Sequence, residues 1–285
     1  MAEIAAGICA KPNFRYWLAE HPIILSFRWD HNVWGSSFVF LALSVFAFLL
    51  LVLFLKIAMK FRSKPLPLGR IPAIHNFIVL VMSVIILAGY WEATAVELRE
   101  TRWLWRKRRV VEWLICFPLG IRSTGRVFFW SYVFYLTKYF EMMDLLIQIL
   151  AKQSVTFFHI VSGVAPVFVC FFWLEFSQSL QILYIVMDTI TNVILYGKFF
   201  FGGDEESQRP FPRCTSLATR CRIFEFVVTI MANLWVAWLH LRKEGCNGMV
   251  GCVLNACWNV IFFLFFLRFS GRQSTARHPP AVKEG

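Results

Sequence analysis

The sequence predicts an all-α protein that crosses a membrane about seven times. Hydrophobic residues make up 58% of the chain and charged residues only 16%, whereas about 25% of the residues in soluble domains are charged. The apolar residues also gather in long segments, and a transmembrane helix needs roughly 20 of them in a row. Composition and clustering together exclude an ordinary soluble domain and favour a multi-pass membrane protein.

Seven segments are candidate spans, and they divide into two groups. Four have 20 or more residues and carry no charge: 36–55, 71–91, 153–174 and 245–267. The other three are 127–150, 179–201 and 226–241, with isolated charges inside the first two. The loops between the segments are short. We therefore expect one membrane domain over residues 36–269, preceded by an extramembrane segment at 1–35 and followed by a basic cytosolic tail at 270–285.

The net charge of +12 has three interpretations, one of which is a phosphate-bearing small-molecule partner. Residues 103–109 interleave tryptophans with basic residues, which is typical of a nucleic-acid-binding patch. In so apolar a chain, tryptophans at the membrane interface and basic residues at anionic headgroups explain the same pattern. We therefore expect contacts with membrane lipids and no nucleic-acid partner.

Basic residues also predict the orientation of the chain. The first loop is basic and should be cytosolic, because it contains Lys56, Lys60, Arg62, Lys64 and Arg70. Seven spans then place the C-terminal tail in the cytosol and the basic run at 106–109 on the opposite side. Either that run lies along the membrane surface or the number of spans differs by one. A short re-entrant piece at 110–121 would fit both alternatives.

The eight cysteines form no Cys-x-x-Cys pair, which is the usual spacing of a structural zinc site. We therefore expect no metal ion. Cys116 and Cys246 differ from the other cysteines, because both fall in loops on the same predicted side of the membrane.

One predicted span holds three charged residues. Lys138, Glu141 and Asp144 are spaced by three, which places them on one face of a helix. Charges are unfavourable inside a bilayer and usually line a cavity or a functional site. This face therefore predicts a buried polar cavity, although the same residues could instead form an ion network that fixes helix register.

These charges and the single histidine that follows them resemble the signatures of the ELO family of very-long-chain fatty acid elongases. Lys138, Glu141 and Asp144 match its Lys-x-x-Glu-x-x-Asp pattern, and His159 stands where its His-x-x-His-His box begins. The spacing between the two signatures is also that of the family.

Two later segments extend the resemblance. Residues 187–196 are similar to the family segment Met-Asn-x-x-Val-His-x-x-Met-Tyr, and residues 219–226 are similar to Thr-x-x-Gln-x-x-Gln-Phe. The match in order and spacing covers roughly residues 71–269, and residues 20–36 resemble the plant branch of elongase-like proteins.

The resemblance implies an acyl-CoA condensing enzyme of the endoplasmic reticulum membrane, in which six helices enclose a narrow acyl tunnel. Its substrates would be acyl-CoA and malonyl-CoA, with no cofactor. Its partners would be membrane lipids and either other elongation-cycle enzymes or a second copy of the chain. The oxidising lumen of that compartment predicts a disulfide between Cys116 and Cys246. The implied catalytic residues are His159, Lys138, Glu141 and Asp144, and the implied substrate-binding residues are Ser162 and Asn192.

The chain departs from the family pattern at its histidines. Ser162 and Gly163 fill the second and third positions of the box, Asn192 fills the later histidine position, and Arg222 and Glu225 replace the two glutamines. The family is thought to hold the acyl chain on a histidine, because neutral imidazole is nucleophilic and leaves well once protonated. Serine needs an activating base and asparagine cannot shuttle a proton. We therefore expect weak or no condensation by the family's usual route.

Two functions remain open after these departures. The first is a 3-oxoacyl-CoA synthase, and the second is a non-catalytic elongase-like protein that binds acyl lipid or regulates an elongase complex. Ser162 and Gly163 could simply let two membrane helices pack closely. Ser162 also shares a helix face with His159, so the two could form an acyl-transfer pair. Asn192 can hydrogen-bond and is also compatible with a structural role.

Overall fold

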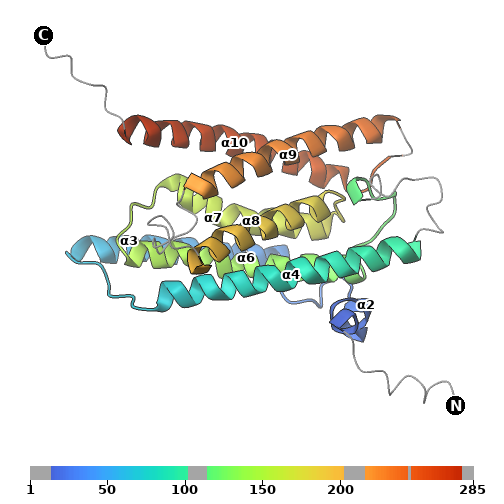
Figure 1. Cartoon of the computed structure of the whole chain (residues 1–285), viewed down its shortest axis with the longest axis horizontal. Helices are drawn as coiled ribbons and strands as arrows, with labels where there is room; N and C mark the ends of the chain where they lie inside the picture. The colour runs from blue at the N-terminus through green and yellow to red at the C-terminus, as the bar shows by residue number, and fades with distance from the viewer. Residues whose placement is uncertain (1–13, 102–113, 202–215, 243–244, 278–285) are drawn as a thin grey trace, which may run out of the picture.

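A computed structural model describes residues 14–101, 114–201, 216–242 and 245–277. All seven predicted spans are long helices in the described part of the chain (Figure 1). They are α3 (Phe38–Phe61), α4 (Ile71–Thr101), α6 (Arg126–Leu150), α7 (Phe157–Glu175), α8 (Gln181–Phe201), α9 (Ser216–Arg242) and α10 (Met249–Arg277). The predicted all-α fold is therefore confirmed.

The helices have the length and composition of membrane spans. Five of them, α3, α4, α7, α8 and α9, are long and apolar enough to cross a bilayer, and the stretch Met249–Phe265 of α10 is a shorter apolar helix. α6 has 25 residues but carries Arg126, Lys138, Glu141 and Asp144. A helix with that many charges is tolerated in a bilayer only when they face the protein interior. The chain is a multi-pass membrane protein.

Six of the helices form a closed ring. Each packs against the next in the order α4, α6, α7, α10, α9 and α8, and α8 returns to α4. α3 packs on the outside of this ring, against α6. The predicted enclosure by six helices is therefore confirmed. α6 packs against α4 and α7, also contacts α8 across the ring, and has α3 behind it.

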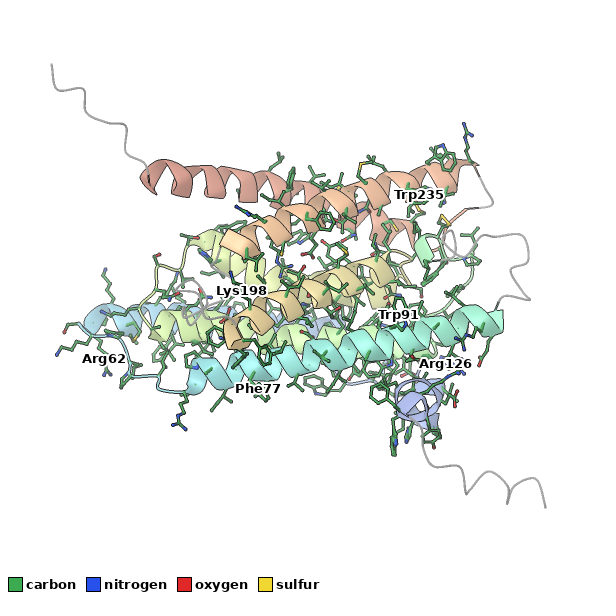
Figure 2. The ribbon with its side chains drawn as sticks, viewed as in Figure 1. Arg62, Phe77, Trp91, Arg126, Lys198 and Trp235 are labelled. Atoms are coloured by element: carbon green, nitrogen blue, oxygen red, sulfur yellow. A yellow bond between two sulfur atoms is a disulfide. The ribbon has the colours of Figure 1, made fainter. Side chains whose placement is uncertain are left out.

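The bundle has two chemically different ends. At the basic end, the loop 62–70 meets the turn after α6: Leu66 N–H donates to the Leu150 carbonyl at 3.1 Å, and Lys56 Nζ donates to the Val155 carbonyl at 2.9 Å. Arg62 of this end and Arg126 of the other lie far apart along the bundle (Figure 2). The predicted seven-helix order thus brings the first loop and the loop between α6 and α7 to one side.

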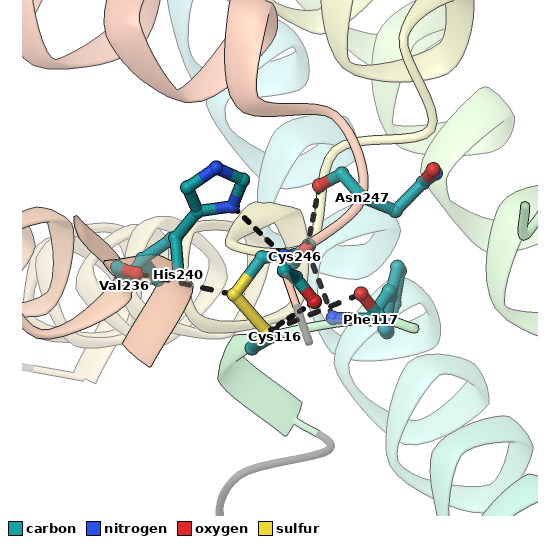
Figure 3. Close-up of a disulfide and its surroundings, with 8 residues drawn as sticks. Cys116, Phe117, Val236, His240, Cys246 and Asn247 are labelled. Atoms are coloured by element: carbon teal, nitrogen blue, oxygen red, sulfur yellow. Dashed lines mark hydrogen bonds between the residues drawn. A yellow bond between two sulfur atoms is a disulfide. The ribbon is translucent and has the colours of Figure 1, made fainter. Parts of the chain in front are cut away.

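The opposite end, called the disulfide end below, is closed by the predicted bond between Cys116 and Cys246 (Figure 3). Their Cα atoms are 5.0 Å apart, within the normal range for a disulfide. Asn247 N–H donates to the Phe117 carbonyl at 2.8 Å, and Cys246 N–H donates to His240 Nδ1 at 2.9 Å. The disulfide therefore joins the segment before α6 to the turn between α9 and α10.

Part of the predicted extramembrane segment is ordered against the disulfide end. It contains a short π-helix, η2 (Tyr16–Glu20), and a short α-helix, α2 (Pro22–Leu25). Trp130 Nε1 donates to the Leu18 carbonyl at 2.8 Å, and Arg126 Nε donates to the Ala19 carbonyl at 2.9 Å. The run at 103–109 lies outside the described residues, as does the first part of the piece at 110–121, so both orientation alternatives stay open.

Candidate functional site

A cavity of about 290 Å³ lies inside the ring, and side chains of α6, α7, α8, α9 and α10 line it. The cavity extends along α6 from Phe134 to Gln148, a distance of about 21 Å at 1.5 Å per residue. Gln148 and His159 are at the part nearest the basic end, and Phe134 and Trp173 are at the part nearest the disulfide end. The cavity therefore runs along the bundle axis.

The charged face predicted for α6 lines this cavity. Lys138 is 4% exposed and Asp144 is 6% exposed, and both contribute to the cavity wall together with Glu141. Lys138 Nζ lies 3.0 Å from Glu141 Oε1 and 4.2 Å above the centre of the Phe134 ring. Gln148 Nε2 donates to Asp144 Oδ2 at 3.2 Å. The three charges are thus held inside the bundle, away from lipid.

An ion network joins α6 to α8 and α9. Lys138 pairs with Asp188 as well as with Glu141. The other oxygen of Asp188 lies 2.8 Å from Arg222 NH1, and the same nitrogen lies 2.7 Å from Glu225 Oε2. Because Asp188 and Glu225 are both buried, these charge-assisted hydrogen bonds are what makes their ionised forms tolerable.

Asn192 of α8 donates hydrogen bonds to two carboxylates of this network. Its Nδ2 donates to Glu141 Oε1 and to Asp188 Oδ2, each at 3.2 Å. Asn192 is 1% exposed and is not among the residues that line the cavity. In this structure it orients two carboxylates, and the substrate-binding role that the family resemblance implied for it stays a prediction.

Sequence reasoning missed Asp188, Arg222 and Glu225 as members of the site. The signal was present, because Asp188 stands at the asparagine of the family's 187–196 segment and the other two stand at its glutamines. What the sequence did not reveal is that these departures, together with Asn192, contact one another. Their contacts depend on the register of α8 against α9, which only the folded chain fixes.

His159 is engaged at the start of α7. The backbone N–H of Thr156 donates to His159 Nδ1 at 3.2 Å, and the Thr156 hydroxyl lies 2.8 Å from the same nitrogen. The two residues form a capping box, which satisfies donors at a helix N-terminus. Because a backbone N–H can only donate, Nδ1 is the acceptor, and the proton of the neutral ring is on Nε2. The ring caps the start of α7 through Nδ1, and the catalytic role that the family resemblance implies for His159 stays a prediction.

The two small residues of the box lie at different places. Ser162 lines the cavity, but its hydroxyl donates to the His159 carbonyl at 3.1 Å and not to the His159 ring. The structure therefore does not form the Ser–His pair considered from the sequence. Gly163 packs against α6, where an added Cβ would lie 2.5 Å from Leu145 Cδ1. Close helix packing explains Gly163 directly.

Aromatic side chains close the inner part of the cavity. The rings of Phe134 and Trp173 stack with centroids 6.4 Å apart, and Trp173 contacts Tyr184 with centroids 4.9 Å apart. The Tyr184 hydroxyl donates to Asn259 Oδ1. Phe134, Trp173 and Tyr184 are called the aromatic floor of the cavity. Lys138 Nζ lies 4.2 Å above the centre of the Phe134 ring, so the ion network is in contact with this floor.

The described residues contain no group of three or more His, Cys, Asp or Glu side chains arranged to hold a metal ion. Two cations, Lys138 and Arg222, lie in the cavity wall among carboxylates. Such cations can stabilise a carboxylate or a developing oxyanion of a ligand.

Fold and site together define a polytopic helical protein with a charged cavity lined by five of its spans. Residues 33–276 match the family model described as ELO: GNS1/SUR4 family. The chain is 38% identical to "Fatty acid elongase 3-like" of Arabidopsis thaliana over 90% of both chains. It is 30% identical to "Fatty acid elongase sre1" of Dictyostelium discoideum over 89% of this chain and 91% of that protein. The chain belongs to the ELO (GNS1/SUR4) family of fatty acid elongases.

Proposed function

We propose that this chain binds a long-chain acyl-CoA and condenses it with malonyl-CoA to 3-oxoacyl-CoA in the endoplasmic reticulum membrane. The observation that carries the proposal is the presence of Lys138 and Arg222 in a cavity that runs about 21 Å along α6. Membership of the elongase family supports the same reaction class. The basic residues between 56 and 70, at the end of α3 and in the loop after it, support a cytosolic basic end, where both CoA substrates would enter.

The reaction would proceed without an acyl-histidine. Malonyl-CoA loses carbon dioxide, the resulting carbanion attacks the thioester carbonyl of the acyl-CoA, and CoA leaves as a thiolate that takes up a proton. The two cations would stabilise the malonyl carboxylate and the oxyanion formed at the attacked carbonyl. Nδ1 of His159 accepts a hydrogen bond from Thr156, so it would not hold the acyl group between two steps. Both substrates would therefore have to be bound at the same time.

A second function, binding of acyl lipid without turnover, is favoured by a different observation. Ser162 and Asn192 stand at histidine positions of the family pattern, and both side chains are already hydrogen-bonded within the protein. A chain that kept the fold and lost the nucleophile could still hold an acyl chain and act on an elongase complex. In this case acyl-CoA would bind and no 3-oxoacyl-CoA would form.

One experiment separates the two functions. Purified protein in nanodiscs is incubated with acyl-CoA and labelled malonyl-CoA, and both acyl-CoA binding and 3-oxoacyl-CoA formation are measured. Condensation should be lost in Lys138→Met and retained in Ser162→Ala, which removes only a hydroxyl bonded to its own helix. Binding without product would support the lipid-binding function. A protein that does neither would contradict both proposals.

A further inference from the structure

Two buried amide side chains, Gln181 of α8 and Asn255 of α10, lack hydrogen-bond partners among the described residues. Gln181 is fully buried and Asn255 is 3% exposed. All four of their side-chain polar atoms are unpaired. Leaving buried polar groups unpaired is unfavourable, and the large majority of such groups in folded proteins have a partner. Gln178, in the turn before α8, is also fully buried, with both side-chain polar atoms unpaired in the described part of the chain. Unpaired amides on two spans whose side chains meet therefore point to a ligand.

Contacts on both sides fix the relative depth of these amides. Gln178, in the turn before α8, lies against Gly251, where an added Cβ would sit 3.2 Å from Gln178 Oε1. Tyr184 of α8 donates to Asn259 of α10. Gln181 is three residues from both Gln178 and Tyr184, and Asn255 is four residues from both Gly251 and Asn259. Residues at such spacings share a helix face. The two amides therefore lie at the same level, between two observed contacts.

We call these residues the α8–α10 seam. It consists of Gln178, Gln181 and Tyr184 on the α8 side and of Gly251, Asn255 and Asn259 on α10. Its inner end is part of the cavity wall, because Tyr184 and Asn259 line the cavity. Its outer end reaches the disulfide end, where Ser179 Oγ donates to the Asn247 carbonyl at 3.0 Å. The seam is therefore a polar connection through an otherwise apolar part of the bundle.

α9 presents polar groups of the same kind. Glu225, Thr229 and Asn233 are spaced by four along α9 and so share a face. Glu225 lines the cavity, and Asn233 has a buried side-chain oxygen with no partner among the described residues. Repeated polar residues on neighbouring spans are typical of hydrated paths in membrane proteins.

We propose that the α8–α10 seam binds ordered water, which bridges Gln181 and Asn255 and connects the cavity to the disulfide end. Each amide offers two donors and an acceptor, and a buried water typically makes about three hydrogen bonds to otherwise unsatisfied groups. The inference does not depend on whether the cavity condenses or only binds its ligand. It gives the buried site a hydrated connection separate from the basic end.

Radiolytic labelling in oxygen-18 water tests the proposal directly. Hydroxyl radicals formed at a bound water oxidise the side chains next to it, and Cys252, which is buried and adjoins Gln178, is the probe. In the full chain in nanodiscs, we expect Cys252 to be labelled by slowly exchanging water. The label should disappear in Gln181→Leu/Asn255→Leu and persist in Leu183→Met, a neighbouring apolar exchange of similar volume. An unlabelled Cys252 in the unaltered protein would overturn the proposal.

Thermal stability of the leucine variants provides an independent measurement. If one water network bonds both amides, each single leucine variant leaves the other amide with fewer hydrogen bonds and lowers Tm. The double variant should then lower Tm by less than the sum of the two single-variant changes. If the amides are dry and independent, each leucine raises Tm and the two effects add, which contradicts the proposal. Coupling without labelling of Cys252 would mean a direct bond between the amides, and this result also overturns it.

Discussion

Asp188 and Arg222 form an ion pair 2.8 Å long between α8 and α9, and both stand where the family segments have an uncharged amide residue. Lys138 bonds the same carboxylate and Glu225 bonds the same guanidinium. Either charge without the other would leave a buried group without its partner, which is strongly unfavourable. We therefore interpret the departures from the family pattern in α8 and α9 as one coupled change that rebuilt the polar site.

This coupling predicts an order of stabilities. Breaking a buried ion pair costs about 3–5 kcal/mol, but the Arg222 side chain keeps 28% exposure. We therefore expect Arg222→Gln to lower the free energy of unfolding by about 2 kcal/mol. The triple variant Asp188→Asn/Arg222→Gln/Glu225→Gln, which restores the uncharged pattern, should lose less than Arg222→Gln alone.

Denaturant unfolding in detergent measures these differences. Arg220→Gln is a matched control, because Arg220 is an exposed basic residue of the same helix. It should change stability by less than about 0.5 kcal/mol. A triple variant less stable than Arg222→Gln would show that the three departures are not coupled.

Gly163 and Gly197 should respond oppositely to the same substitution. A Cβ at Gly163 would lie 2.5 Å from Leu145 Cδ1, whereas a Cβ at Gly197 meets no atom within 4 Å. Gly163→Ala should destabilise by about 1–3 kcal/mol through overpacking, and Gly197→Ala should be neutral or stabilise by up to about 1 kcal/mol. Adding Leu145→Val should recover part of the loss at Gly163, as measured by thermal unfolding.

The same contact limits how the family box could be restored. Histidine at position 163 would be far larger than the alanine considered above, so restoring all three histidines together should damage packing between α6 and α7. Ser162→His/Asn192→His is the better variant, because it leaves Gly163 unchanged. Increased 3-oxoacyl-CoA formation by this double variant would show that the cavity still orients the substrates, and unchanged or lower formation would contradict that reading.

The disulfide should contribute measurably to stability. It joins residues 130 positions apart, and a disulfide typically stabilises a protein by about 2–4 kcal/mol. Cys246→Ser should lower Tm, and a reductant should lower the Tm of the unaltered protein to the same value without affecting the variant. Cys257→Ser, at an exposed free cysteine, is the control and should change nothing. Equal Tm values with and without reductant would contradict the prediction.

The helices could be predicted from the sequence because their signals are local. The disulfide could be predicted because the expected topology placed Cys116 and Cys246 on one side of the membrane, and the family resemblance implied that this side is oxidising. Long apolar runs define the spans, and spacing by three placed Lys138, Glu141 and Asp144 on one face. The partners of that face could not be predicted, because Asp188 and Arg222 reach it only through the register of α8 and α9. The structural use of His159 was also hidden, since Thr156 looks like an ordinary helix start and its bond to Nδ1 appears only in the folded chain.

The aromatic floor of the cavity should limit the length of the acyl chain that it takes. Trp173 stacks on Phe134 and contacts Tyr184, and all three line the inner end of the cavity. Trp173→Ala removes the largest of these side chains, so we expect its preference among saturated acyl-CoAs of increasing length to shift toward longer chains. Competition binding to protein in nanodiscs measures this preference without requiring turnover.

Phe171→Ala is the matched control for this prediction. Phe171 is buried on the same helix, but it contacts Trp29 and Tyr135 and does not line the cavity. Each variant removes a buried aromatic ring, and such deletions commonly cost about 3–5 kcal/mol. Both should therefore lose stability, and only Trp173→Ala should bind longer chains. The pair therefore separates stability from chain-length preference. An equal shift of the preferred length in both variants would mean that general loosening of the bundle sets the length. No shift in either variant would mean that the acyl chain ends before it reaches Trp173.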